Sequence, residues 1–223
     1  MASVPPAAGA PAAGAAMDEA RQLRKSGQSA KALALLDRAA EAAPADMPLT
    51  GERGLLALEL GSLDKARGLL QAASEAGPAD WRIYSGLGAA LAAAGRQQEA
   101  QMAFAKALEI KPDHPSVLNN LALSYALDGR HEQAEMLLRR AAEARAAKPQ
   151  AKQNLALLLA LKGKTEESRK LAATTLPPEQ VRANASYLAS LSGGTSEPAP
   201  QRSAEANQPG LGSPVYRLGG PAE

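Results

Sequence analysis

Cysteine is absent from the 223 residues of this chain. Without a thiol there is no disulfide, no cysteine nucleophile and no thiolate metal site. Aromatic residues are also scarce, since the chain has one tryptophan, four tyrosines and one phenylalanine. Nucleic-acid bases and sugars are bound by stacking on aromatic side chains, so both ligand classes lose support.

Neither sign of charge is in excess, and long apolar runs are missing. The 25 basic and 23 acidic residues leave a net charge of +2, which argues against a nucleic-acid partner or an anionic membrane surface. No apolar run approaches the ~18 residues of a transmembrane helix, and we find no secretory signal peptide. We therefore expect membrane attachment only through an anchor that this chain lacks.

Candidates for chemistry are few. The two histidines, His114 and His131, lie far apart in the sequence without a second metal ligand at helical spacing, and we expect both to be exposed. The pair Gly86 and Gly88 lies inside a predicted helix rather than in a phosphate-binding loop. Because no nucleophile–base pair is evident, we predict a non-catalytic protein with no cofactor and no metal site.

What the chain does have is a regular internal repeat. Glycines recur at one constant interval, as Gly27, Gly61, Gly95, Gly129 and Gly163. A period of about 34 residues is typical of helix-turn-helix units that stack into a solenoid. Each glycine is expected at the end of a first helix, where a left-handed cap carries no Cβ penalty. The sequence thus predicts an all-α protein, a right-handed α-solenoid of about five units.

Other positions keep the same register. Small residues, which allow two helices to cross closely, recur in the first helix as Ala20, Gly54, Gly88, Ala122 and Ala156. Large apolar residues, expected to fill the space between units, recur in the second helix as Leu36, Leu70, Phe104 and Leu138. Pro44, Pro78 and Pro112 are expected to end the second helices of the first three units, because proline cannot continue them.

Composition marks the ends of the repeat domain, which we place at residues 17–191. Its last part, residues 178–191, is predicted to form a capping helix, because Pro178 suits a first helical turn and apolar residues follow at helical spacing. The flanking residues 1–16 and 192–223 are rich in Ala, Pro, Gly and Ser. They lack the apolar side chains needed to offset ordering entropy, so both are predicted to be disordered tails.

The repeat resembles the tetratricopeptide repeat, most closely over residues 81–114 and 115–148. In that family the first helix of each unit lines a concave face, which implies a protein-binding surface over units three to five. The inward residues there are Arg82, Ser85, Ala89, Ser116, Asn119, Asn120, Leu123, Leu127, Gln153, Asn154, Leu157 and Leu161.

These residues predict an apolar groove floor with a row of amides. Asparagine and glutamine both donate and accept hydrogen bonds, so they can hold a peptide backbone of any sequence. Alternatively, the amides bridge neighbouring helices. The four leucines predict an apolar or amphipathic partner segment, unless the capping helix or a tail fills the groove in cis. Asn119 and Gln153 stand where a two-carboxylate clamp would need lysine, so a C-terminal acidic peptide is not expected.

A narrower resemblance concerns residues 80–191. The strings at 118–130, 134–141 and 153–159 resemble the TadD proteins of bacterial Tad (Flp) pilus assembly. That family implies an outer-membrane lipoprotein facing the periplasm, a pilotin that helps a secretin ring assemble. The family's lipid-attachment cysteine is absent here. Two other interpretations stay open: a cytoplasmic co-chaperone or regulatory scaffold, and the repeat portion of a larger transferase.

Overall fold

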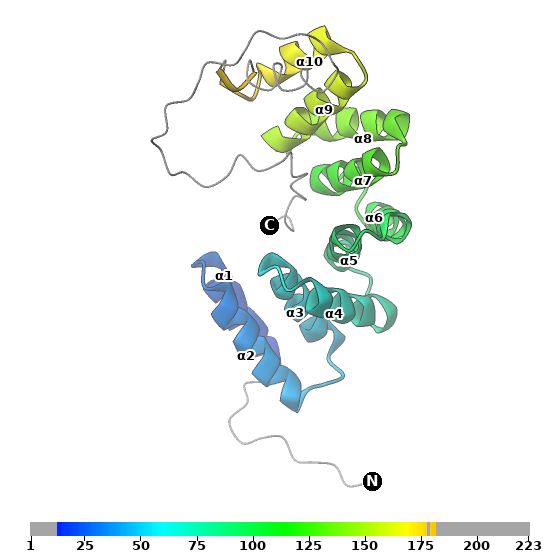
Figure 1. Ribbon diagram of the computed structural model, residues 1–223. Coiled ribbons are helices and arrows are strands. Elements are labelled where there is room, and N and C mark those ends of the chain that lie inside the picture. The colour runs from blue at the N-terminus through cyan, green and yellow to red at the C-terminus, as the bar shows by residue number, and fades with distance from the viewer. Residues whose placement is uncertain (1–12, 178, 182–223) are drawn as a thin grey trace, which may run out of the picture.

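A computed structural model of the chain describes residues 13–177 and 179–181, and this part is a stack of antiparallel helix pairs (Figure 1). Its helices are α1 (Ala13–Lys25), α2 (Ser29–Ala42), α3 (Met47–Glu59), α4 (Leu63–Ala76), α5 (Trp81–Ala93), α6 (Gln97–Ile110), α7 (Pro115–Leu127), α8 (His131–Glu143), α9 (Pro149–Leu161) and α10 (Thr165–Ala172). Residues 179–181 are also helical, and the described residues contain no strand. The predicted right-handed all-α solenoid of five helix pairs is confirmed.

The predicted glycine caps are confirmed at every turn between paired helices. All five glycines of the repeat have φ between 74° and 77°, in the left-handed region. In the third unit the Gly95 amide donates to the Ala92 carbonyl at 3.0 Å, and the Arg96 amide donates to the Leu91 carbonyl at 3.0 Å. These two bonds satisfy carbonyls at the end of the helix. The glycine therefore ends the first helix and turns the chain into the second.

Close helix crossing explains the small residue of the first helix. A Cβ atom on Gly88 would lie 2.7 Å from both Cδ1 and Cε1 of Phe104, and one on Gly54 would lie 2.7 Å from Cγ of Leu70. Phe104 and Leu70 are fully buried. Glycine therefore lets the large residue of the second helix press against the backbone of the first.

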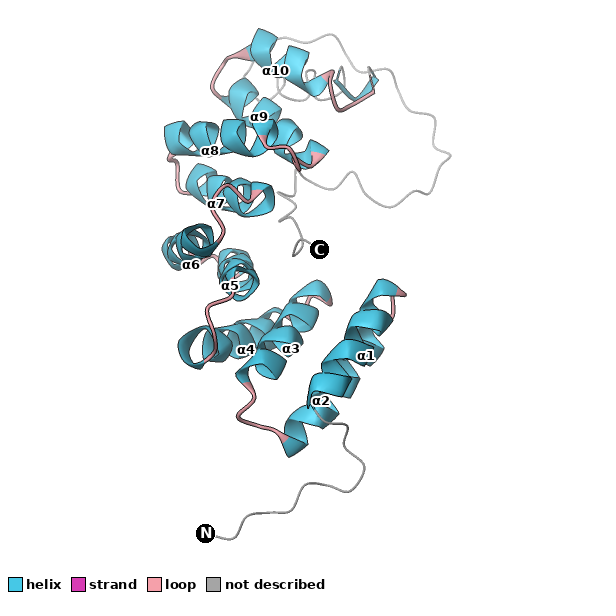
Figure 2. Ribbon diagram, turned by 180° about the vertical axis from the view of Figure 1, so that it is seen from behind, coloured by secondary structure: helices cyan, strands magenta, loops and turns pink. Residues whose placement is uncertain are grey.

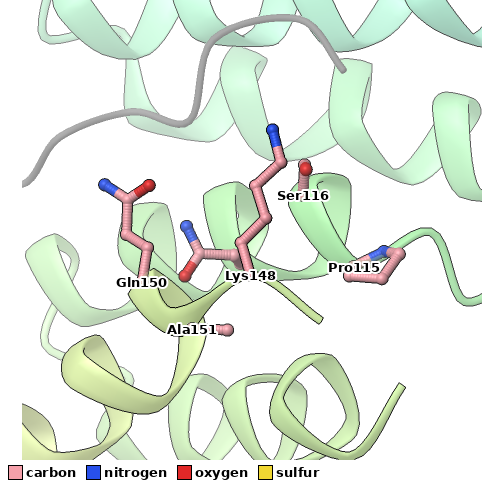
Figure 3. Close-up of a pocket in the computed structure, with 6 residues that line it drawn as sticks. Pro115, Ser116, Lys148, Gln150 and Ala151 are labelled. Atoms are coloured by element: carbon pink, nitrogen blue, oxygen red, sulfur yellow. The ribbon is translucent and has the colours of Figure 1, made fainter. Parts of the chain in front are cut away.

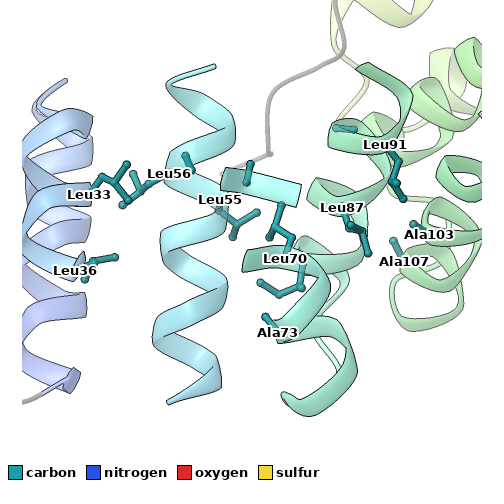
Figure 4. Close-up of a cluster of buried hydrophobic side chains, with 14 of the residues drawn as sticks. Leu33, Leu36, Leu55, Leu56, Leu70, Ala73, Leu87, Leu91, Ala103 and Ala107 are labelled. Carbon is teal, nitrogen blue, oxygen red and sulfur yellow. The ribbon is translucent and has the colours of Figure 1, made fainter. Parts of the chain in front are cut away.

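The core runs along the stack instead of filling one centre. Figure 4 shows Leu33 and Leu36 of α2 facing α3, and Leu70 of α4 lying between α3 and α5. These side chains are buried, and they belong to one apolar cluster that extends from Ala16 to Leu121. Each unit thus covers its apolar face with the next unit, as expected for a solenoid.

A buried carboxylate joins the fourth unit to the fifth. Glu135 of α8 accepts hydrogen bonds from Lys162 Nζ at 2.6 Å, Lys164 Nζ at 2.8 Å and Arg139 Nη2 at 2.8 Å. Burial opposes ionisation of this group, but the hydrogen bonds from the three cations outweigh it and lower the pKa of Glu135 to about 2. The two lysines lie on the α9–α10 turn, so the contact links adjacent units.

The N-terminal boundary differs from the prediction. Helix α1 begins at Ala13 rather than at residue 17, and Ala16 is fully buried in the core. A run of alanines offered no apolar pattern to reveal this start, yet alanine has a high helix propensity and fits a close crossing. Residues 1–12 lie outside the described part of the chain.

Only the beginning of the predicted capping helix is described. The Val181 amide donates to the Pro177 carbonyl at 3.1 Å, and the Val181 side chain is buried with Ala156 and Ala172. Residue 178, the rest of that helix and the tail at 192–223 lie outside the described residues. Among residues 13–177 and 179–181, no helix is long and apolar enough to cross a membrane.

Candidate functional site

Helices α5, α7 and α9 lie on the inner side of the curved stack, and α6 and α8 lie on its outer side (Figures 1 and 2). The predicted partner-binding residues all belong to these three inner helices. Their side chains differ in exposure and pairing, which determines what each can offer to a partner.

On α5 the predicted inward side chains are either small or ion-paired. Arg82 Nη1 lies 2.8 Å from Glu52 Oε1, and Arg82 Nη2 lies 2.7 Å from Asp80 Oδ2. The hydrogen bond to Asp80, helped by the charge of Glu52, raises the pKa of Arg82. Ser85 is half-buried and Ala89 is buried. Arg82 is therefore held by two carboxylates rather than presented as a free cation.

Amide side chains join α7 to α9. Asn154 Nδ2 donates to Asn119 Oδ1 at 2.8 Å, and Asn119 Nδ2 donates to Asn120 Oδ1 at 3.2 Å. Asn119 is 4% exposed and Asn120 is 2% exposed, whereas Asn154 and Gln153 are half-buried. The structure thus brings three of the four predicted amides into one chain of hydrogen bonds, and it contains the bridge between helices that the alternative interpretation expected.

The predicted leucines divide into two groups. Leu123 is only 2% exposed and Leu157 is half-buried, whereas Leu127 is 52% exposed and Leu161 is 54% exposed. Leu127 and Leu161 occupy the same position, at the ends of α7 and α9. Exposed leucines cost free energy in water, so this pair is the part of the face that would gain most from a partner.

A small depression lies where α7 and α9 begin. Two residues that were predicted to face a partner, Ser116 and Asn119, line it together with Pro115, Lys148, Gln150 and Ala151. Figure 3 shows the side chains of Ser116, Lys148 and Gln150 rising on the same side of the two helices. Apart from Lys148 these residues carry no charge, so the depression suits a polar, uncharged backbone.

The histidines are not exposed, contrary to expectation. His114 and His131 are both half-buried, and the His114 ring lies 4.2 Å from the Trp81 ring between centroids. Burial, followed by the charges of Lys111 and Lys148, lowers the pKa of His114. The stacking partner stands at the start of the preceding inner helix, so no local pattern could reveal it. His114 acts as a packing residue between units.

Comparison with protein families supports the repeat assignment. Two models described as tetratricopeptide repeat match residues 17–73 and 80–147. Together these matches span both halves of the helical stack. The comparison with curated proteins gave no match.

Many solved structures share the fold. A structure of MamA AMB-1 is 30% identical over 59% of this chain and 78% of its own, with a TM-score of 0.54. YrrB, described as a TPR protein with an unusual peptide-binding site, is 18% identical over 76% of this chain and 89% of its own, with a TM-score of 0.63. Pseudomonas aeruginosa pilF is 16% identical over 81% of this chain and 84% of its own, with a TM-score of 0.66. The last two similarities concern the fold.

Proposed function

Because this chain belongs to the tetratricopeptide repeat family, whose members act as protein-interaction scaffolds, we propose that it holds a segment of a partner protein on the inner face of α5, α7 and α9. The observation that carries the proposal is the pair Leu127 and Leu161, which stand more than half exposed beside a row of amides. An apolar segment of a partner would bury the exposed half of both side chains, which is worth about 1–1.5 kcal/mol for each leucine, half of the value for complete burial.

The chemistry of this face selects the kind of segment. Helices α7 and α9 present no charged side chain at the predicted inward positions, so a strongly acidic or basic peptide gains nothing there. Gln153 and Ser116 are half-buried and supply donors and acceptors with which an extended backbone can pair. The expected partner segment is therefore uncharged, with two or more apolar side chains.

At the finer level, we propose that the partner belongs to pilus assembly, with a secretin segment as the expected occupant. The support is the resemblance of residues 118–130, 134–141 and 153–159 to TadD proteins, because the first and third of these strings hold seven of the twelve predicted inward residues. The fold is also shared with Pseudomonas aeruginosa pilF. In this proposal the chain is a pilotin-like factor at the periplasmic face of the outer membrane.

Partner capture from a bacterial envelope extract tests both levels. The bait is the full chain, compared with Leu161→Asp on the inner face and Met136→Asp on α8. Met136 is a matched control because it is 59% exposed on an outer helix. We expect the wild type and Met136→Asp to recover a secretin, and Leu161→Asp to lose at least tenfold of it.

The other outcomes separate the two levels. If Leu161→Asp and Met136→Asp recover the secretin equally, the proposed face is wrong. If Leu161 is required but the protein recovered is a cytoplasmic chaperone, the scaffold function stands and the pilus assignment fails. A secretin domain purified separately, titrated against both variants, then measures the affinity directly.

A further inference from the structure

We propose that the chain carries its own competitor for this face, residues 211–218, which occupy the inner side of α7 and α9 in cis until a partner displaces them. This inference rests on the proposed function, since it assigns a regulator to the same site. Three observations support it: the exposed leucines, the composition of the C-terminal residues and the point where the described chain ends.

The face needs an apolar cover. Leu127 and Leu161 are exposed at equivalent positions of adjacent units, and Leu157 lies half-buried one turn before Leu161. In the two preceding units the equivalent position holds Glu59 and Ala93, so the apolar row is confined to the C-terminal end of the stack. Its occupant must therefore be available near α9 rather than near α1.

The C-terminal residues contain one segment with the required chemistry. Residues 192–210 have no Leu, Ile, Val, Met, Phe, Tyr or Trp. Residues 211–218 then read Leu-Gly-Ser-Pro-Val-Tyr-Arg-Leu, in which half of the side chains are large and apolar. In an extended backbone Tyr216 and Leu218 point to the same side, as a pair of anchors for two leucines requires. Pro214 favours that extended form in the residue before it.

The N-terminal residues do not compete for this role. Residues 1–12 contain only Met1 and Val4 as large apolar side chains. They join the stack at α1, at the opposite end from α9 (Figure 1). Composition and attachment point therefore both favour the C-terminal segment.

The connecting length suits the site. Val181, at the start of the predicted capping helix, is anchored against Ala156 of α9 itself, and beyond residue 191 the connection to Leu211 is the Gly-, Pro- and Ser-rich stretch 192–210. A flexible linker of roughly 20 residues spans roughly 25 Å on average. Helix α9 has 13 residues and is about 20 Å long. A linker whose average span matches the distance gives an effective concentration of the order of millimolar, so even a weak contact is occupied within one molecule.

Disulfide trapping in the full chain tests the proposal, because the absence of native cysteine makes any disulfide unambiguous. One variant combines Leu161→Cys with Arg217→Cys, because Arg217 lies between the two proposed anchors. Its matched control combines Met136→Cys with Arg217→Cys, which places an equally exposed thiol on the outer helix α8. Both are oxidised at low micromolar concentration and separated on a non-reducing gel. We expect the intrachain disulfide to form at least ten times faster at position 161, since a disulfide needs Cα atoms within about 7 Å.

A third variant adds Tyr216→Asp and Leu218→Asp to the Leu161→Cys pair, and its rate should fall to that of the control. Equal rates at positions 161 and 136, or an unchanged rate in the third variant, would overturn the proposal. A product that is mainly an interchain dimer and grows with concentration would also overturn it, because a second copy would then be the occupant.

The substitutions Tyr216→Asp and Leu218→Asp also show whether the cis competitor and the proposed function fail independently of each other. In the envelope capture, the chain carrying Tyr216→Asp and Leu218→Asp should recover several times more partner than the wild type. If trapping fails while capture still depends on Leu161, the cis competitor is wrong and the scaffold function stands. If trapping succeeds while capture ignores Leu161, the competitor stands and the proposed partner site is wrong.

Discussion

The substitution Gly88→Ala has two opposite effects on stability, and both come from the added Cβ atom. In the middle of α5, alanine in place of glycine favours the helix by about 1 kcal/mol. The new Cβ would however lie 2.7 Å from two ring atoms of Phe104 and 3.0 Å from its Cγ. That ring is fully buried, and Cγ is the ring atom next to its own backbone, so it cannot swing away without moving α6. The steric clash should therefore outweigh the gain in helix propensity, so that the substitution destabilises the protein.

The expected result is a net destabilisation of about 1–2 kcal/mol, because overpacking a core costs roughly 1–3 kcal/mol and the helix propensity returns part of it. The chain itself contains the compatible alternative, since the next unit places Ala122 beside a position occupied by Leu138, and both are buried. Phe104→Leu should therefore rescue Gly88→Ala, with a coupling of about 1 kcal/mol or more in a double-mutant cycle.

Urea unfolding followed by circular dichroism and by the fluorescence of Trp81 provides the assay. Trp81 is the only tryptophan and lies in the same helix as Gly88, so it reports on this unit even if the stack unfolds stepwise. Gly68→Ala is the control, because Gly68 lies in α4 with no atom within 4 Å of its added Cβ. It should stabilise by about 0.5–1 kcal/mol. If both substitutions stabilise the protein equally, the close-crossing argument is refuted.

Three further predictions concern contacts between and within units. Glu135→Gln should cost about 1–2 kcal/mol of stability at neutral pH. Because the folded pKa of Glu135 lies near 2, below its usual value near 4.5, the wild type should lose this stabilisation as pH falls from about 4.5 to 2. The difference between the urea midpoints of the two proteins should therefore be smaller at pH 3 than at pH 7. Asn154→Ala removes the donor to the buried Asn119 and should cost about 1–3 kcal/mol of stability, measured by the same urea midpoints. An unchanged midpoint would contradict this prediction and would mean that water replaces the amide. Gly129→Ala forces a Cβ into a turn with φ of 74° and should cost about 1 kcal/mol; a neutral effect would contradict the cap assignment.

The repeat period was enough to predict the helix pairs, their turns and much of the core. Every unit has the same local structure. Gly95 and Gly129 both adopt a positive φ at the turn, and Phe104 and Leu138 are both buried at the equivalent position of the second helix. The pattern is local, because the two helices that cross within a unit are neighbours in the sequence. For that reason a single sequence sufficed to predict the helix pairs, whereas the position of the first helices on the inner side was implied by the resemblance to the tetratricopeptide repeat.

The tertiary structure decided which inward residues are presented and which are covered. Leu123 and Leu127 lie one turn apart on the same helix and both were predicted to face a partner, yet one is buried and the other is half exposed. The bridge from Asn119 to Asn154 and the stacking of His114 on Trp81 join residues from different units. Exposure and such pairs depend on side chains brought together by the stacking of units, and the repeat pattern of one unit carries no information about them. The sequence by itself therefore determined the solenoid and the helix pairs of each unit, and only the packing of one unit on the next decided which side chains the inner face exposes.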